Sequence, residues 1–331
     1  MVSESGYCRG ADGKAMSSLS QYQEKFRKLV VNVRAGRASP HKICMLLALL
    51  DLARSGALER NRVEFGPALL ERYAHFFDSV KAPDDHANPY FPFFHLSGRL
   101  RGGGESFWYL RPLPGHEKVL AAMSTARSFR DITENIECAE LDPELYALLR
   151  EPTCIDSLAE AISHHWFDRG LADLRAVMAE SRRVSGYEHA LRSGRPQQVR
   201  ELHAPAYVRD PAFRRVVTQI YDYRCAASGA RIVLPTGEAM VQAAHIHPFS
   251  QAGGDDPRNG IALTPDMHWA MDTSLIAPGP DLRWHVSTII DERIPDFDRF
   301  INLRGKQLIL PREARFHPKR EVLEWRREHL R

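Results

Sequence analysis

The sequence predicts an α+β protein of two domains, a mostly helical first domain and a second domain in which short strands alternate with turns. Three observations lead to this prediction. The chain has 331 residues, enough for two domains that each bury a core. Helical periodicity dominates residues 21–170. From about residue 205 onward, short β-type segments separated by turn residues replace it.

Composition narrows the class of protein. Hydrophobic residues make up 44% of the chain and charged residues 26%, which are ordinary globular values. The longest apolar run, residues 43–50, is much shorter than the roughly 20 residues of a membrane-spanning helix. The first residues show no signal-peptide pattern, so we expect a soluble cytoplasmic protein with no membrane partner. The five cysteines are widely spaced without a CxxC pair, which argues against disulfides and against a structural zinc site.

The first domain begins after a Ser- and Gly-rich segment, residues 1–20, that we expect to be a flexible arm. Residues 21–33 carry apolar side chains at i, i+3, i+4 and i+7, which predicts a helix. Ser39-Pro40 opens a second helix that is apolar almost all round and stops near Gly56. Such a helix is expected to lie buried at the centre of the domain.

Shorter elements are expected in the rest of the first domain, and they are a strand at 61–65, a helix at 69–77, a loop at 81–92, a strand at 106–110 and helices within 119–170. The polar, Arg-rich residues 171–205 predict a helical or flexible linker. We therefore expect an arm at 1–20, a first domain at 21–170, a linker at 171–205 and a second domain at 206–331.

Three of the 15 histidines fall within residues 245–268 of the second domain. A predicted strand ends at His245, and a second one is expected at 261–263. Pro265 then opens a helix that carries His268 and Asp272 at i and i+4, on one face. This arrangement suits a one-metal phosphodiesterase, because one imidazole removes a proton from water while the metal ion stabilises the charge on the phosphate.

The string CAASG…AAHIHPF…GGDDPRNGIALTPDMHWAMD resembles an HNH nuclease domain with the ββα-metal fold, in the branch found in bacterial restriction endonucleases. The resemblance covers roughly residues 206–331 and places the motif letters at His245, Asn259 and His268. It implies that His245 is the general base and His268 a ligand of one divalent metal ion. Asn259 would fix the loop so that His245 points at the phosphate.

The second metal ligand is left open. Many HNH nucleases have an acidic ligand directly before the general base, and Ala244 occupies that position here. Asp272 is the first candidate and His247 the other, although Asp272 also suits a helix surface and His247 a capped loop. Mg²⁺ is the expected ion for phosphoryl chemistry, and imidazole ligation also suits Mn²⁺, Co²⁺ and Ni²⁺.

Three further residues of this domain are expected to have structural roles only. Asp255 and Asp256 stand between Gly and Pro, where we expect them to form a turn. Cys225 by itself cannot build a tetrahedral zinc site.

The first domain is similar to the sulfur-binding domain of phosphorothioate-dependent restriction endonucleases, in which such a domain precedes an HNH nuclease. The similarity covers roughly residues 21–170 and rests on PHKICMLLALLDL, NRVEF, NPYFPFFHL, FWYL and ARSFRDI…AELDPELYALL. Sulfur is larger and less hydrated than the phosphate oxygen it replaces. A site for it should therefore be a shallow apolar cup surrounded by cations for the backbone charge.

The resemblance implies that an aromatic-proline pair forms this cup, here Phe91 and Pro92, with Phe91 in place of the usual Tyr. Tyr90 and His95 lie beside the pair in sequence. An arginine also lines the family site, and Arg127 is the candidate, with Arg130 in reserve. Packing in the core is the alternative for Phe91 and Pro92, and a surface salt bridge is the alternative for Arg127.

DNA contacts outside the cup are expected at the start of the buried helix. His41 and Lys42 would read base edges there, and Arg34 and Arg37 would contact phosphates. A solvated helix start is the alternative for His41 and Lys42. The net charge of 45 − 42 = +3 is modest, but positive charge is concentrated locally along the chain.

The sequence thus predicts an enzyme of an antiviral restriction system that cuts phosphorothioated double-stranded DNA. Cutting both strands requires two active sites, so a homodimer is expected. The first alternative is an HNH enzyme that reads another mark, such as a modified cytosine, or unmodified DNA. The second is a DNA-binding regulator with a degenerate nuclease domain, motivated by Ala244.

Overall fold

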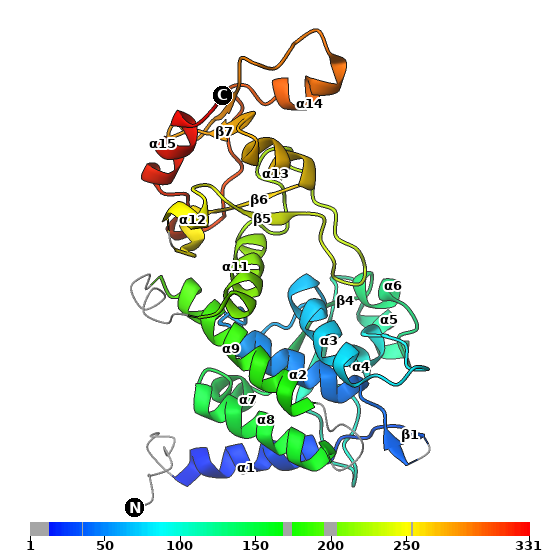
Figure 1. Ribbon diagram of the computed structural model, residues 1–331. Helices are drawn as coiled ribbons and strands as arrows, with labels where there is room; N and C mark the ends of the chain where they lie inside the picture. Colours follow the sequence, from blue (N-terminus) through cyan, green and yellow to red (C-terminus); the bar gives the residue numbers. More distant parts are fainter. Residues whose placement is uncertain (1–12, 35, 168–173, 195–203, 253) are drawn as a thin grey trace, which may run out of the picture. The chain divides into compact units, whose positions relative to one another are not determined.

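The protein is described here by a computed structural model of residues 13–34, 36–167, 174–194, 204–252 and 254–331. The chain divides into two compact units, Met1–Ser185 and Gly186–Arg331. Figure 1 shows the order of their helices and strands. Within the described residues, no helix combines the length and the apolar character that crossing a lipid bilayer requires.

The first unit is mostly helical. Its helices are α1 (Gly13–Arg27), α2 (His41–Arg54), α3 (Pro67–Val80), α4 (Tyr90–His95), α5 (Glu117–Ala122), α6 (Phe129–Thr133), α7 (Pro143–Leu148) and α8 (Pro152–Phe167). Two antiparallel pairs join β1 (Val33–Arg34) to β2 (Arg37–Ala38) and β3 (Trp108–Pro112) to β4 (Ile136–Leu141). Helix α9 (Leu174–Arg192) begins in this unit and ends in the second, within the segment expected to be a linker.

Helix α2 is the buried central helix that the sequence predicts. All side chains from Ile43 to Leu50 are at most 2% exposed, and α2 packs against α3, α4 and α8. Pro40 is its N-cap residue, and Gly56 with φ +75° follows its end. The all-round apolar pattern therefore reflects a helix covered on every side.

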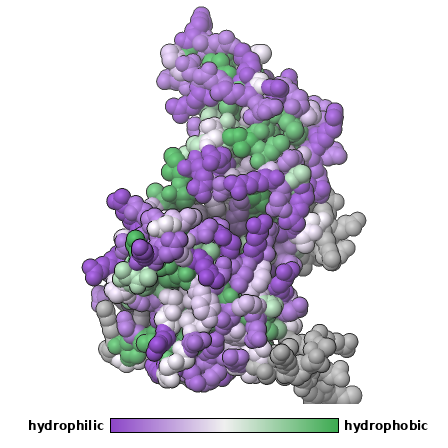
Figure 2. All heavy atoms as spheres, turned by 180° about the vertical axis from the view of Figure 1, so that it is seen from behind, coloured by the Kyte–Doolittle hydropathy of each residue, from purple (hydrophilic) through white to green (hydrophobic). Residues whose placement is uncertain are grey.

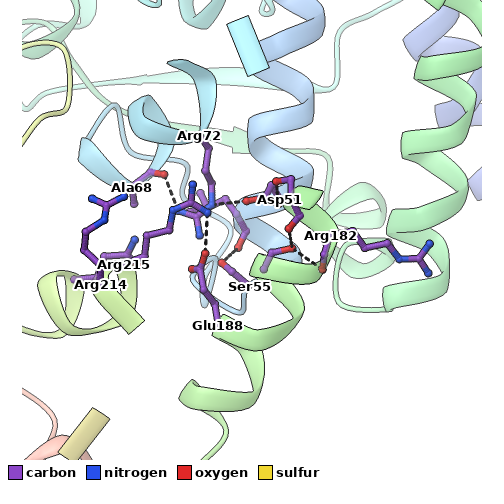
Figure 3. Close-up of polar contacts among 12 residues, drawn as sticks. Asp51, Ser55, Ala68, Arg72, Arg182, Glu188, Arg214 and Arg215 are labelled. Carbon is purple, nitrogen blue, oxygen red and sulfur yellow. Dashed lines mark hydrogen bonds and ion pairs between the residues drawn. The ribbon is translucent and has the colours of Figure 1, made fainter. Parts of the chain in front are cut away.

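The core around α2 also holds an ion pair (Figure 3). Arg72 Nε donates to Asp51 Oδ2 at 2.9 Å, and both side chains are at most 4% exposed. Ser181 Oγ donates to the other carboxylate oxygen at 2.6 Å, and Arg72 also donates to the Ala68 carbonyl. Each buried charge is thus hydrogen-bonded, which offsets the cost of removing it from water.

The helix expected at residues 21–33 differs from α1, which runs over Gly13–Arg27 and begins inside the segment expected to be an arm. Phe26 and Leu29 are buried as the periodicity predicts, but Val30 and Val33 are 48% and 55% exposed. Gly36, with φ +79°, turns the chain so that Val33 pairs with Ala38 in β1–β2. The helix therefore ends at Arg27, and strand pairing of Val33 replaces the helix that its spacing predicts.

The sequence prediction missed β4, because residues 119–170 were expected to be helical. In the structure β4 pairs with β3, and Ala139 also bridges to Val63. The strand expected at 61–65 is reduced to that single bridge. The burial pattern of β4 alternates only in part, so its strand character depends on its partners.

The second unit contains α11 (Ala206–Ile220), α12 (Phe249–Ala252), α13 (Pro265–Asp272), α14 (Asp298–Ile301) and α15 (Arg320–Glu328). Strand β5 (Gln242–His245) pairs antiparallel with β6 (Gly260–Leu263), and β7 (Ile276–Pro278) with β8 (Trp284–Val286). Short 3₁₀ turns lie at η1 (Pro257–Asn259), η2 (Pro295–Phe297) and η3 (Ala314–Phe316). The expected strand, strand and helix around the histidines correspond to β5, β6 and α13.

Helix α11 packs closely on the β5–β6 pair at Gly260. A Cβ atom at this position would lie 2.4 Å from Val217 Cγ2 and 3.0 Å from Phe213 Cζ. Only glycine therefore allows this approach. The buried Cys225 Sγ accepts hydrogen bonds from the backbone N–H groups of Ser228 and Thr264, both at 3.4 Å. The thiol is therefore a structural group in the core of this unit.

Candidate active site

His245 is the last residue of β5, opposite Gly260 of β6. Its imidazole stacks on the ring of Phe213 from α11, with centroids 4.0 Å apart and an interplanar angle of 1°. The side chain is 25% exposed. One ring face is therefore covered and the orientation is fixed, while part of the ring remains open to solvent.

Asp255 orients His245 from the other side. His245 Nε2 lies 3.3 Å from Asp255 Oδ1, and the carboxylate is only 4% exposed. Tyr187 Oη donates to Oδ2 at 3.0 Å, and Arg209 lies 3.6 Å from the same oxygen. Burial, together with this carboxylate, raises the pKa of Tyr187, which keeps its hydroxyl proton on the donor side of the bond.

The arrangement of His245 and Asp255 defines the tautomer of the imidazole. With the buried carboxylate as the acceptor, Nε2–H is the hydrogen-bond donor, so Nδ1 carries the lone pair in the neutral ring. Sequence reasoning assigned Asp255 to a turn and missed this contact. The only sequence signal for this role is that Asp255 is an acidic residue in the loop between β5 and β6. The adjacent Asp256 has the same signal, so the sequence cannot distinguish the two.

Asn259 holds the loop that follows His245. Its Oδ1 accepts from the His247 backbone N–H and its Nδ2 donates to the His247 carbonyl, both at 2.8 Å. The Asn259 backbone carbonyl also accepts from Ile246 N–H at 2.8 Å. Because Asn259 is only 4% exposed, these bonds are shielded from competing water.

His268 and Asp272 face each other on α13. His268 Nε2 lies 3.3 Å from Asp272 Oδ2, and His268 Nδ1 lies 2.9 Å from Gln242 Oε1 of β5. An Nδ1–H donated to the glutamine oxygen leaves the Nε2 lone pair directed toward the carboxylate. Nε2 and Oδ2 are therefore two potential metal-donor atoms on one face of α13.

The donor atoms of His268 and Asp272 fit a divalent ion. Two atoms bound to one ion at about 2.1 Å lie about 3 Å apart, close to the observed separation. Gln242 would then accept a hydrogen bond from Nδ1 of the metal-binding imidazole. Residues that do not bind the metal themselves commonly orient histidine ligands in this way. Within the described ranges, however, no group of three or more His, Cys, Asp or Glu side chains is placed to hold a metal ion. A metal ion bound at this position would have His268 and Asp272 as its protein ligands, and water and phosphate oxygens would complete the coordination.

His247 does not join His268 and Asp272 in a three-ligand group. Its ring stacks on Trp325 of α15 at 4.2 Å, and Trp325 in turn stacks on His329 at 3.9 Å. Burial lowers the pKa of His247, and the neighbouring positive charge of Arg326 acts in the same direction. The structure therefore shows His247 as a contact between the active-site loop and the last helix.

Arg326 of α15 contacts the backbone next to His245 and the backbone near the end of α13. Its guanidinium donates to the carbonyls of Ile246, His245 and Met271 at 2.5, 3.3 and 3.2 Å. The side chain is 3% exposed. One buried cation thus ties the end of β5 to the end of α13, and sequence reasoning did not identify it.

In the first unit, the residues expected to contact sulfur lie on and around α4. Phe91 packs its ring against His95 at 4.3 Å, and Pro92 is buried. His95 Nε2 lies 2.9 Å from Thr125 Oγ1, which brings α4 beside the segment that carries Arg127. Burial, with the charge of Lys42, lowers the pKa of His95. Tyr90 instead packs edge-on against Phe129 and donates to Asn88 Oδ1.

The residues expected to contact bases and phosphates differ in availability. Both ring nitrogens of His41 are engaged, with Ser39 Oγ at 2.9 Å and the His86 carbonyl at 3.0 Å. Arg37 pairs with Asp85 at 2.8 Å and also donates to the Val80 carbonyl. Burial lowers the pKa of Lys42. Arg127 is exposed, and the side chain of Arg34 lies outside the described part of the chain.

A cavity of about 400 Å³ lies within the first unit between α2, α3, α8 and α9. Its wall is mainly apolar, from side chains such as Leu47, Phe76 and Met178. None of the residues expected to contact sulfur or DNA lines it. The expected sulfur cup is therefore a different surface, the one around Phe91.

Comparison with known proteins identifies the class to which the site belongs. Residues 225–277 match the family model of the HNH endonuclease. This segment contains His245, Asp255, Asn259, His268 and Asp272, the residues described above. Residues 225–277 of the chain therefore form an HNH endonuclease domain.

One solved structure similar to part of the chain is described as a modification dependent TagI restriction endonuclease. The two share 21% sequence identity with a TM-score of 0.29, over 39% of this chain and 40% of that one. The matched region thus spans less than half of that enzyme. No curated protein matches this chain at a significant level.

Proposed function

We propose that this protein is a restriction endonuclease that binds phosphorothioated double-stranded DNA and hydrolyses phosphodiester bonds at a one-metal HNH site of the ββα-metal type. The observation that carries the catalytic part is the contact between His245 and the buried Asp255 carboxylate, within a segment that matches the HNH endonuclease family. The antiparallel pair β5–β6 followed by α13 supports the same interpretation.

His245 acts as the general base in this proposal. Because Nε2–H is held by Asp255, Nδ1 takes the proton from a water molecule as the water oxygen bonds to phosphorus. The bond from phosphorus to the leaving oxygen breaks in the same step. The imidazolium that forms lies against the Asp255 carboxylate, which stabilises its charge.

His268 and Asp272 would hold the divalent metal ion, with Gln242 fixing the imidazole. When bound, the ion stabilises negative charge on the phosphate and on the leaving oxygen. Mg²⁺ is the ion we propose, and the imidazole ligand also favours activity with Mn²⁺, Co²⁺ or Ni²⁺. Asn259 keeps the loop after His245 in one conformation and takes no part in proton transfer.

Recognition of sulfur is proposed for the surface around Phe91. The half-buried ring of Phe91 against His95 provides an apolar contact, and we assign the DNA backbone to Lys42, whose charge acts on His95, and to the exposed Arg127, two residues after the His95 partner Thr125. Sulfur carries a weaker hydration shell than oxygen, so an apolar contact selects it. The cations supply affinity for the polyanion.

Cleavage of two plasmid preparations tests the proposal, one from a host with DNA phosphorothioation and one from a host without it. Each is incubated with the purified protein and with Mg²⁺, Mn²⁺, Co²⁺ or Ni²⁺. We expect cutting of the phosphorothioated plasmid only, lost in His245→Ala. Equal cutting of both plasmids would contradict sulfur recognition, and an inert wild type with all four ions would favour a regulator.

A pair of variants at one position tests the sulfur contact itself. Phe91→Ala removes the ring and should abolish the preference for phosphorothioated duplex in a binding assay. Phe91→Tyr keeps the ring and should retain the preference. Equal preference in all three proteins would place sulfur recognition elsewhere.

A further inference from the structure

Trp269 is an exposed aromatic residue on the helix that carries the proposed metal ligands. Its exposed fraction is 55%, whereas the neighbouring Met267, Ala270 and Met271 on the inner face of α13 are at most 3% exposed. It directly follows His268 and precedes Asp272 by three residues, nearly one helical turn. The indole therefore emerges on the outer surface of α13, beside the proposed metal ligands.

This exposure is unusual for tryptophan in the protein. Trp108, Trp166 and Trp284 are fully buried, and Trp325 is stacked between His247 and His329. Within the described residues, the ring of Trp269 stacks on no other aromatic ring. The surface is hydrophilic over most of the face shown in Figure 2, with apolar residues in separate patches. An indole left uncovered beside a catalytic site calls for a ligand that covers it.

Arginines lie near both ends of α13, beside the helix's own Asp266 and Asp272. At the start of the helix, Arg299 lies 3.5 Å from Asp266 and is itself 62% exposed. After its end, the backbone N–H of Arg331 donates to the Ser274 carbonyl. An exposed indole on a helix with exposed arginines near both of its ends offers stacking together with positive charge, the two interactions by which proteins hold nucleic acid.

We propose that Trp269 is a DNA-contacting residue that packs its ring on the deoxyribose and base edge beside the scissile phosphate, with Arg299 and Arg331 contacting flanking phosphates. This inference rests on the proposed active site at His245, His268 and Asp272. The ring fixes the lateral position of the DNA strand, so that the phosphate lies between the general base and the metal ligands. Trp269 acts through binding and exchanges no proton.

Trp269→Ala and Trp269→Phe test the inference in the full-length protein. Ile289→Ala is the matched control, since Ile289 is an equally exposed apolar residue, at 60%, on the turn after β8. A short fluorescein-labelled phosphorothioated duplex is titrated in EDTA, so that no cleavage occurs, and tryptophan emission is followed at the same time. Cleavage of the same duplex with Mn²⁺ then gives KM and kcat for each protein.

We expect DNA to quench tryptophan emission in wild type and in the Ile289 variant, and the quenching to be largely lost in Trp269→Phe. Trp269→Ala should raise KM about tenfold, and the Phe variant should recover most of that loss because it keeps a stacking ring. Equal quenching and equal KM in wild type and both Trp269 variants would overturn the inference while leaving the nuclease intact. A wild type that neither binds nor cuts the duplex would overturn both this inference and the proposed function.

Discussion

The side chain of Asn259 forms two hydrogen bonds with the backbone of a single residue, His247. Oδ1 accepts from the His247 N–H and Nδ2 donates to its carbonyl, each at 2.8 Å. The amide thus forms the pair of backbone hydrogen bonds that a neighbouring β-strand would form. It holds the loop at His247, two residues after His245. This contact gives the middle letter of the HNH motif a structural role.

Replacing Asn259 tests this role with two different losses. Asn259→Ala removes both bonds, and Asn259→Asp keeps the acceptor but places a second oxygen against the His247 carbonyl. Each unpaired buried backbone group costs about 1–3 kcal/mol, which corresponds to roughly 5- to 150-fold in rate if it is lost from positioning, so both variants should cut DNA more slowly by on the order of tenfold or more. Single-turnover cleavage measures this, with the exposed Asn302→Ala as control. Wild-type rates in Asn259→Asp would show that the donor bond is dispensable.

Asp255 and Asp256 are adjacent carboxylates with different partners, which allows a matched comparison. Asp255 faces His245, whereas Asp256 pairs with Arg258 and Lys319. Asp255→Asn removes the charge that stabilises the imidazolium and should lower kcat on the order of a hundredfold, with the concentration dependence on Mn²⁺ unchanged. Asp256→Asn should keep kcat. If Asp255→Asn instead shifts the Mn²⁺ dependence, the carboxylate is a metal ligand.

Asp256 also predicts a pH dependence of stability. Burial alone would raise the pKa of this carboxyl, but hydrogen bonds from Arg258 and Lys319 outweigh burial and lower the pKa to about 2. A pKa below the ordinary 3.8 means that the ionised form stabilises the folded state above about pH 4, by about 2 kcal/mol. That contribution is lost as the pH falls through about 2.

Melting temperatures of wild type and Asp256→Asn between pH 7 and pH 2 measure this contribution. We expect the variant to melt lower at neutral pH and the difference to shrink below about pH 4. The exposed Asp296→Asn should follow wild type throughout. A difference that stays constant down to pH 2 would mean that the ion pairs of Asp256 contribute nothing to stability.

Arg326 is expected to support both stability and activity. Arg326→Met leaves the carbonyls of His245, Ile246 and Met271 without their buried donor, at a cost of about 3 kcal/mol. The melting temperature of the unit should fall by roughly 6–12 °C. Arg327→Met changes the exposed neighbouring arginine and should melt like wild type. An Arg326→Met protein as stable and active as wild type would contradict the role of Arg326 as a tie between β5 and α13.

Several elements could be predicted because their signals are local. The buried helix α2 follows from an all-round apolar pattern after Ser39-Pro40, and the helix at His268 from Pro265 at its first position. By contrast, β4 exists because β3 and Val63 supply its hydrogen bonds, and no local pattern reveals such partners. At Val33 a local helical spacing predicts a helix that does not form, because the turn at Gly36 brings Val33 into a strand pair with Ala38.

The same division holds for the active site. His245, Asn259, His268 and Asp272 lie within one short stretch of chain, so residue types, spacing and the resemblance to HNH nucleases were enough to predict a role for each of them and to suggest phosphodiester hydrolysis. The sequence by itself thus predicts the chemistry. Only the tertiary structure decided how that chemistry is supported, because α9, α11 and α15 bring Tyr187, Phe213 and Arg326 from distant parts of the chain. Burial then turns Asp255 from a turn residue into the partner of His245, since a carboxylate removed from water must find its hydrogen bonds within the protein.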